Sequence, residues 1–186
     1  MLGVLRWLAG FPLAVLHRLG APAGWLAYAL SPSYRRRFIA NARQAGLGPA
    51  ESRPAIAEAG RLLLELPRLW LRPAGEPISP PVRWEGAEAI DAALALGRGV
   101  VFLTPHLGCF EVTAQAYAER YGPRFGPITV LFRPARKAWL RPLVGGSRTR
   151  PGLAAAPATL AGVRQMIRAL RRGEAVGLLP DQVPPE

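Results

Sequence analysis

The chain has 186 residues, 50% of them hydrophobic, and a formal net charge of +12. This length and composition suit one domain with a proper core and exclude a disordered chain. One cysteine and two histidines exclude an intrachain disulfide and a cysteine-rich zinc site, so no metal is expected. The positive charge favours an anionic partner, without choosing among nucleic acid, anionic lipid and an acidic protein.

Residues 1–30 form a hydrophobic segment with only three ionisable side chains. Its longest apolar run, Trp7–Leu16, is shorter than the roughly 20 residues that a spanning helix needs. We expect the segment to associate with a membrane, whether it spans the bilayer or lies on it. A secretory signal peptide and a buried helical hairpin are the alternatives; Arg35, Arg36 and Arg37 weigh against export, because positive charge tends to remain cytoplasmic.

Residues 31–81 read as a helical segment that ends in a linker. A basic helix is expected at 34–45 after the start signal Ser31-Pro32-Ser33, and a second helix at 54–71, where apolar residues recur every three or four positions. Pro67 is expected to kink or end the second helix. The proline-rich stretch 72–81 is the expected boundary to the core.

Residues 82–186 alternate between short β-forming runs and helical patterns. This alternation predicts an α/β fold, with a mostly parallel, mixed sheet flanked by helices. The chain stops directly after a strand, so we expect it to be a C-terminally truncated fragment with an incomplete core. Strands are expected at 82–84, 100–104, 128–132 and 175–179, and helices at 87–96, 110–121, 135–144 and 160–172.

One stretch, VVFLTPHLGCFE, displays reactive groups at the end of a strand. His106 follows the strand, and Glu111 begins the next helix. Placed there, the carboxylate can reach one imidazole nitrogen and leave the other to take a proton from a hydroxyl. The alternative is a capping histidine beside a first-turn acid that the helix dipole favours. Ligands of such sheets bind at the carboxyl ends of strands, where His106, Arg133 and Asp181 all fall.

Cys109 lies three residues from His106 and opens a second chemical possibility. A cysteine beside a histidine can form an acyl-enzyme intermediate, as in a thioesterase or a ping-pong transferase. Its apolar surroundings favour an inert thiol instead, because buried cysteines are rarely reactive.

Three ordered blocks of the sequence resemble a known family. HLGCFE is similar to the His-x4-acid motif of the glycerolipid acyltransferases. Its wider setting, together with LFRPARKAWLRPLVGGSRTRPG and RQMIRALRRGEAVGLLPDQ, resembles more closely the bacterial lipid A biosynthesis acyltransferases, the late lauroyl and myristoyl transferases. The resemblance covers roughly residues 83–182, and the hydrophobic start with its basic helix also resembles this family.

The resemblance implies a glycerolipid-acyltransferase-like fold and acyl transfer from acyl carrier protein to a hydroxyl of a lipid A precursor, without a cofactor. His106 would be the general base and Glu111 its orienting partner. Arg148 would hold the developing oxyanion or a sugar phosphate, a role that Arg150 shares as an alternative. Substrate-binding roles are expected for Arg133, Arg150 and Asp181. Cys109 departs from the polar residue that is common in the family.

The resemblance also implies a location on the cytoplasmic face of the inner membrane, with acyl carrier protein and the lipid acceptor as partners and no nucleic acid. Another glycolipid, such as an acylated mannoside, or a lysophospholipid remains an alternative acceptor. The competitor from another class is a basic, non-catalytic module that binds anionic membrane or nucleic acid. Binding of that kind would weaken steeply with salt and would not depend on His106.

Overall fold

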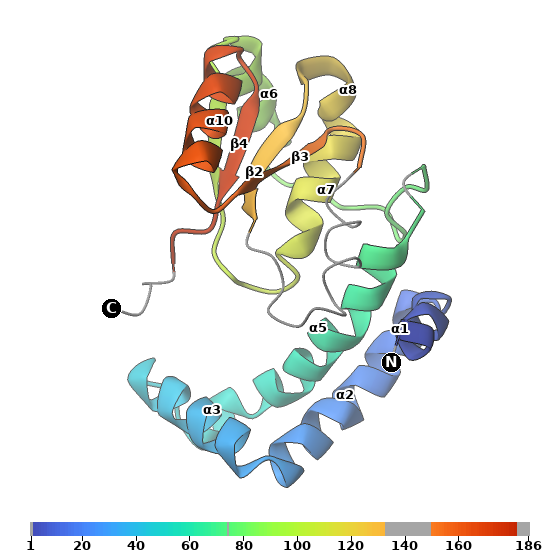
Figure 1. Cartoon of the computed structure of the whole chain (residues 1–186). Coiled ribbons are helices and arrows are strands. Elements are labelled where there is room, and N and C mark those ends of the chain that lie inside the picture. The colour runs from blue at the N-terminus through green and yellow to red at the C-terminus, as the bar shows by residue number, and fades with distance from the viewer. Residues whose placement is uncertain (1, 74, 133–149, 182–186) are drawn as a thin grey trace. The chain divides into compact units, whose positions relative to one another are not determined.

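The computed structural model describes residues 2–73, 75–132 and 150–181 (Figure 1). The chain divides into two compact units, Met1–Arg68 and Leu69–Glu186. The first unit is helical, and the second is built around a β-sheet. The division of the sequence at residues 30 and 81 follows composition instead of contacts, and it stays a prediction.

The helices of the first unit begin and end close to the predicted residues. Ser31 caps α3, because its hydroxyl accepts a hydrogen bond from the Tyr34 backbone N–H at 3.3 Å. Pro67 lies inside α5, which continues for one further turn instead of ending there. The helices are α1 (Leu2–Ala9), α2 (Leu13–Leu30), α3 (Pro32–Gln44), α4 (Pro49–Ser52) and α5 (Pro54–Leu71), the last of which extends into the second unit.

Apolar side chains are exposed along the first two helices. Trp7 of α1 is 62% exposed, and Leu26 and Leu30 of α2 are also exposed. Neither of these helices, nor any other helix in the described ranges, is long and apolar enough to cross a membrane.

Glycines allow α2 and α5 to pack backbone against backbone. A Cβ atom added at Gly60 would lie 2.0 Å from the carbonyl oxygen of Gly20, and one at Gly24 would lie 2.2 Å from that of Ile56. Both distances are far shorter than any real contact of a Cβ atom. The two helices can therefore approach this closely only because side chains are missing at the crossing.

We expect Gly60→Ala to lower the free energy of unfolding by about 3 kcal/mol or more, because the added methyl group forces the two helices apart. The better helix propensity of alanine, about 1 kcal/mol, offsets only part of this cost. Urea unfolding followed by circular dichroism measures the difference. Gly3→Ala in α1 is the matched control: no atom lies within 4 Å of its added Cβ, so stability should stay unchanged or rise slightly.

The second unit contains a parallel sheet with the strand order β1-β4-β2-β3. The α/β class with a parallel sheet is confirmed. The strands are β1 (Val100–Leu103), β2 (Ile128–Phe132), β3 (Leu153–Pro157) and β4 (Ala175–Leu178), and the helices are α6 (Ala87–Ala95), α7 (Glu111–Arg120), α8 (Gly122–Phe125) and α10 (Leu160–Arg171).

One predicted strand was wrong, and one observed strand was not predicted. Residues 82–84 form no strand, and Trp84 instead packs edge-on against the ring of Tyr121, with ring centroids 5.4 Å apart. Strand β3 was missed because its sequence, LAAAP, lacks the β-branched and aromatic residues that indicate a strand. Small residues suit this position, since α10 approaches so closely that a Cβ at Gly162 would lie 1.8 Å from the carbonyl oxygen of Pro157. The helix expected at 135–144 lies outside the described residues.

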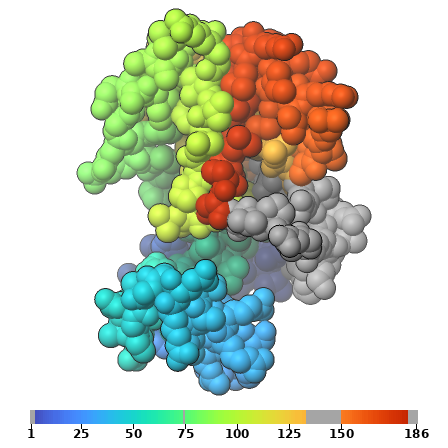
Figure 2. Space-filling model, turned by 90° about the vertical axis from the view of Figure 1, so that its left-hand side faces the viewer, coloured from blue at the N-terminus to red at the C-terminus, as the bar shows by residue number. Residues whose placement is uncertain are grey.

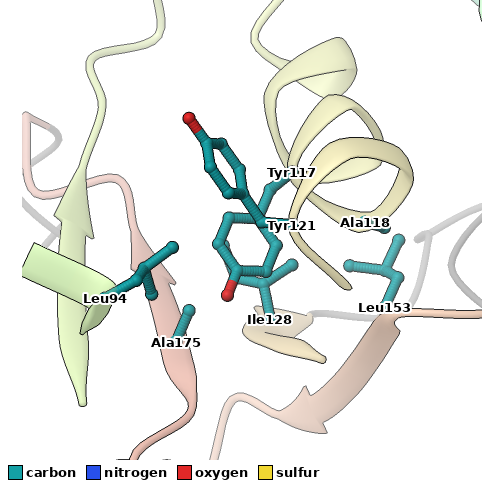
Figure 3. Packing of buried hydrophobic residues seen from close by; sticks show 7 residues of the cluster. All are labelled: Leu94, Tyr117, Ala118, Tyr121, Ile128, Leu153 and Ala175. Carbon is teal, nitrogen blue, oxygen red and sulfur yellow. The ribbon is translucent and has the colours of Figure 1, made fainter. Parts of the chain in front are cut away.

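Helices cover both faces of the sheet (Figure 1). On one face, Tyr117 of α7 and Tyr121, which follows this helix, pack with Leu94 of α6 against strand residues such as Ile128 and Leu153 (Figure 3). On the other face, Met166 and Ala169 of α10 pack against the sheet. With both faces covered, the carboxyl edge of the strands is where this fold presents loops for chemistry.

Candidate active site

Neighbouring strands bring His106 and Asp181 together. Strand β1 pairs with β4 in a register that sets Leu103 opposite Leu178. The pairing extends by one hydrogen bond, from the Thr104 backbone N–H to the Leu178 carbonyl oxygen at 3.0 Å. His106 lies three residues after Leu103, and Asp181 lies three residues after Leu178. The loops after the two strands therefore run side by side (Figure 2).

The Asp181 carboxylate holds His106 through two hydrogen bonds. The Nδ1 atom of the imidazole lies 2.8 Å from Oδ1, and the backbone N–H donates to Oδ2, also at 2.8 Å. One carboxylate therefore fixes both the loop backbone and the ring orientation. As donor to Asp181, Nδ1 carries the proton, which leaves Nε2 as the basic nitrogen.

The His106–Asp181 pair is accessible, with side chains 29% and 37% exposed. The backbone N–H and imidazole of His106 hold the pKa of Asp181 below its usual range, because both hydrogen bonds favour the ionised carboxylate. Phe110 adds an edge-on contact to the imidazole, with centroids 4.7 Å apart. The ring is thus oriented by a charge on one side and packed by an aromatic ring, yet it remains open to a substrate.

Glu111 is the first residue of α7, and it lines a cavity of about 450 Å³ between that helix and the sheet. The carboxylate on Nδ1 is thus supplied by Asp181, for which sequence had indicated substrate binding. The orienting role of Glu111 stays a prediction. Its position at the helix N-terminus is one that favours a negative charge.

The cavity beside Glu111 is lined mainly by apolar side chains. Its volume falls within the usual range for small-molecule sites. Polar residues contribute to the lining at the carboxyl edge, where Thr104, Glu111 and Thr113 lie, and also elsewhere, where Arg83, Glu85 and Gln115 lie. Apolar residues that contribute to it are Val82, Trp84, Ile90, Phe102, Phe110, Ala114, Tyr117, Ile128, Val130, Leu153 and Leu179.

Arg150 is buried and binds backbone instead of facing the cavity. Its guanidinium donates to the carbonyl oxygens of Pro73 at 3.1 Å, Leu69 at 3.2 Å and Arg72. Burial, and to a smaller degree the positive charge of Arg72, lower the pKa of Arg150 from its ordinary value. These contacts give Arg150 a structural task at the end of α5, and its predicted role in substrate binding stays untested.

We expect Arg150→Ala to lower the free energy of unfolding by about 2–4 kcal/mol, because three main-chain carbonyls lose their donor. Urea unfolding measures this loss. Arg98→Ala is the control, since Arg98 is exposed in the turn before β1. An unchanged stability together with a raised KM for the lipid acceptor would instead favour substrate binding by Arg150.

Three other residues singled out in the sequence have different outcomes. Arg133 and Arg148 lie outside the described residues. Cys109 is partly buried in the loop between His106 and α7. Within the described ranges, no group of three or more His, Cys, Asp and Glu side chains is placed to hold a metal ion.

Sequence reasoning missed the His106–Asp181 contact and the cavity wall. The contact has one signal, the equal three-residue distance of both residues from the ends of their strands. That signal becomes readable only when β4 is known to be the neighbour of β1. Trp84 and Tyr117 of the wall carry no signal of their own, because apolar aromatic residues are common in every core.

The whole chain resembles one family of lipid enzymes. The family model of the bacterial lipid A biosynthesis acyltransferases matches residues 1–184. The chain belongs to this family. It is thus an acyltransferase of lipid A biosynthesis, and the site described above is where we look for its chemistry. No curated protein matches the chain.

Proposed function

We propose that this acyltransferase moves a fatty acyl group from acyl carrier protein to a hydroxyl of a lipid A precursor, with His106 as general base. The observation that carries the proposal is the ordered imidazole: Asp181 holds Nδ1 at 2.8 Å, at the edge of the sheet and beside an apolar cavity. A base with a free Nε2 next to a place for a hydrocarbon chain is what acyl transfer to a hydroxyl requires.

The proton steps follow from the orientation of the ring. Nε2 of His106 takes the proton of the acceptor hydroxyl while the oxygen attacks the thioester carbonyl. The positive imidazolium then lies against the Asp181 carboxylate, which stabilises it. When the tetrahedral intermediate collapses, the carbon–sulfur bond breaks, and the imidazolium returns its proton to the carrier thiolate. The products are an ester and a free carrier thiol, so the balance needs no metal or organic cofactor.

The roles proposed for Glu111, Arg133 and Arg148 follow from the resemblance of their sequence blocks to the family. Glu111, at the N-terminus of α7, is proposed to assist His106 or to bind the acceptor hydroxyl. Arg148 is proposed to stabilise the oxyanion or to bind a sugar phosphate, and Arg133 to contact the substrate; the planar guanidinium suits either task. The acyl chain is proposed to enter the apolar cavity between α7 and the sheet.

The partners are chosen by charge and by the exposed apolar surface. A net charge of +12 suits an acidic carrier protein and a phosphorylated acceptor. Exposed apolar side chains, such as Trp7 and Leu30, together with Arg35–Arg37 on α3 suit a membrane surface. We propose that the enzyme acts on the cytoplasmic face of the inner membrane. Another glycolipid or a lysophospholipid is the alternative acceptor.

The test is a transfer assay with the full chain, an acyl carrier protein thioester and a lipid A precursor. Mass spectrometry should show a lipid that is heavier by one fatty acyl group, with release of the carrier thiol. The same assay with coenzyme A thioesters shows whether the enzyme prefers acyl carrier protein as donor. The assay with a lysophospholipid or an acylated mannoside shows whether it prefers the lipid A precursor as acceptor. Preference for a donor or acceptor other than the proposed pair would replace that part of the proposal, and membrane binding without any transfer would contradict it.

A further inference from the structure

The cavity beside the His106 site has two distinct ends. One end, which we take as the mouth for the acyl chain because it adjoins the His106 site, lies at the carboxyl edge of the sheet, where Thr104 and Glu111 contribute to the wall. Phe110, which also lines the cavity, touches the His106 ring edge-on. A chain whose reactive end sits at His106 would therefore enter next to Phe110 and continue between α7 and the sheet.

The far end lies toward the opposite edge of the sheet. Helix α7 starts near the carboxyl edge and runs back along the strands, so its later residues lie deeper. Ile128 and Leu153, the first residues of β2 and β3, line this deep part. Trp84 contributes the largest side chain here, and it packs edge-on against Tyr121 at the end of α7.

Contacts with Arg120 and Tyr121 hold the indole of Trp84 in place. The guanidinium of Arg120 lies over the indole, 5.2 Å from its centroid, and Arg120 also pairs with Asp91 of α6 at 4.0 Å. The perpendicular ring of Tyr121 supports the same indole. A large aromatic ring that is packed between Arg120 and Tyr121 gives this part of the cavity a rigid wall, because the indole has few alternative rotamers that would make room for a longer ligand.

We propose that Trp84 forms the floor of the acyl cavity and sets the length of the chain that the enzyme transfers. The proposal rests on the proposed function, since it assigns the cavity to the acyl group. Chains that end short of the indole leave apolar wall unfilled, and longer chains clash with it. Each methylene gained or lost then changes kcat/KM by about fourfold, so donors that differ by two carbons are separated by roughly tenfold or more.

Substitutions at two positions should shift the preferred chain length in opposite directions. Trp84→Ala deepens the cavity, so the optimum should move to longer chains by two carbons or more; Trp84→Leu is the milder variant that keeps apolar bulk. Ala114 lines the cavity one turn into α7, between the mouth and the floor. Ala114→Leu should block the path there and move the optimum to shorter chains.

Phe125→Leu is the matched control, because this ring also packs near Tyr121, with centroids 6.4 Å apart, but it does not line the cavity. Its length optimum should equal that of the parent. A series of acyl carrier protein thioesters with chains that differ by two carbons gives the profile for each variant. Calorimetric titration with free fatty acids of the same lengths measures the cavity without any turnover.

The two readouts separate this inference from the proposed function. If the Trp84 and Ala114 variants shift the chain length of the best-bound fatty acid in opposite directions, the role of Trp84 as the floor of the cavity is supported. This holds even if no acyl group is transferred, in which case only the proposed function fails. Folded Trp84 and Ala114 variants that keep the optimum of the parent in both assays would overturn the inference, as would an equal shift in Phe125→Leu. Transfer by the parent would then still support the proposed function.

Discussion

Replacing His106 with alanine is expected to lower kcat/KM for acyl transfer by about 10²- to 10⁴-fold, the usual contribution of a general base. The imidazole is the group that we propose takes the proton of the acceptor hydroxyl, and an alanine side chain has no atom that can accept it. Thermal unfolding should change little, because the ring is partly exposed at the edge of the sheet. The rate of ester formation by the full chain, followed by mass spectrometry, is the measurement.

The only other histidine of the chain gives a matched control. His17 joins α2 to α5 through Glu65, with Nε2 and Oε2 2.8 Å apart. His17→Ala should affect the stability of the helical unit and leave the chemical step intact. If His106→Ala transferred acyl groups at a near-normal rate, His106 would not be the base.

Cys109 separates the two chemical mechanisms within the same loop. Cys109→Ser should retain most of the transfer activity if the acceptor hydroxyl attacks the thioester directly. A loss as large as that of His106→Ala, together with an acylated cysteine in the parent protein, would favour a covalent intermediate on the thiol.

Asp181→Asn is the second change with a large expected effect, a fall in kcat by about 10²-fold or more with little change in KM. An asparagine amide can donate to Nδ1, which favours the tautomer whose Nε2 carries the proton and cannot accept one. It also removes the charge that stabilises the imidazolium. Single-turnover rates with a pre-bound donor measure the chemical step.

Glu111→Gln shows how the orienting role is divided. If Asp181 alone orients the imidazole, Glu111→Gln should cost less in kcat than Asp181→Asn and should act mainly on KM. A larger loss in Glu111→Gln than in Asp181→Asn would return the orienting role to Glu111, as the sequence motif predicted. The double variant tests whether the two carboxylates act as one unit, because coupled residues give losses that do not add.

The pH dependence of stability gives Asp181 a signature that kinetics does not. Its folded-state pKa is lowered, so the contact stabilises the fold above the ordinary aspartate pKa of about 4 and is lost as the pH falls through the lower value. The stability difference between the parent and Asp181→Asn should therefore be present at neutral pH and shrink in that acidic window. Urea unfolding of the parent and of Asp181→Asn, at neutral pH and again in the acidic window, measures this stability difference.

Local features of the fold could be predicted from sequence, but the arrangement of the strands could not. β1 and α7 follow from apolar patterns over a few residues, and His106 at the end of β1 follows with them. The insertion of β4 between β1 and β2 depends on contacts between residues far apart in sequence, so no local pattern reports it. For that reason Asp181 was predicted as a site residue without its hydrogen bonds to His106.

Burial and close packing explain two features that sequence did not indicate. Arg150 was expected to bind an anionic substrate, which stays a prediction, and its guanidinium donates to three carbonyl oxygens that sequence did not point to. Sequence does not indicate which arginines are taken up by the backbone. The alanines of β3 fit the close approach of α10, and this steric demand outweighs their low preference for strands.

The place of β4 in the sheet also links the His106–Asp181 contact to the formation of the sheet. Among the strands of the described ranges, β4 comes last in sequence, yet it pairs with both β1 and β2, and no other described strand pairs with β1. The docking of β4 also brings Asp181 to His106, its partner 75 residues earlier in the chain. Pairing over such a separation is a slow, late step of folding. We therefore expect His106 to become oriented only when β4 docks beside β1.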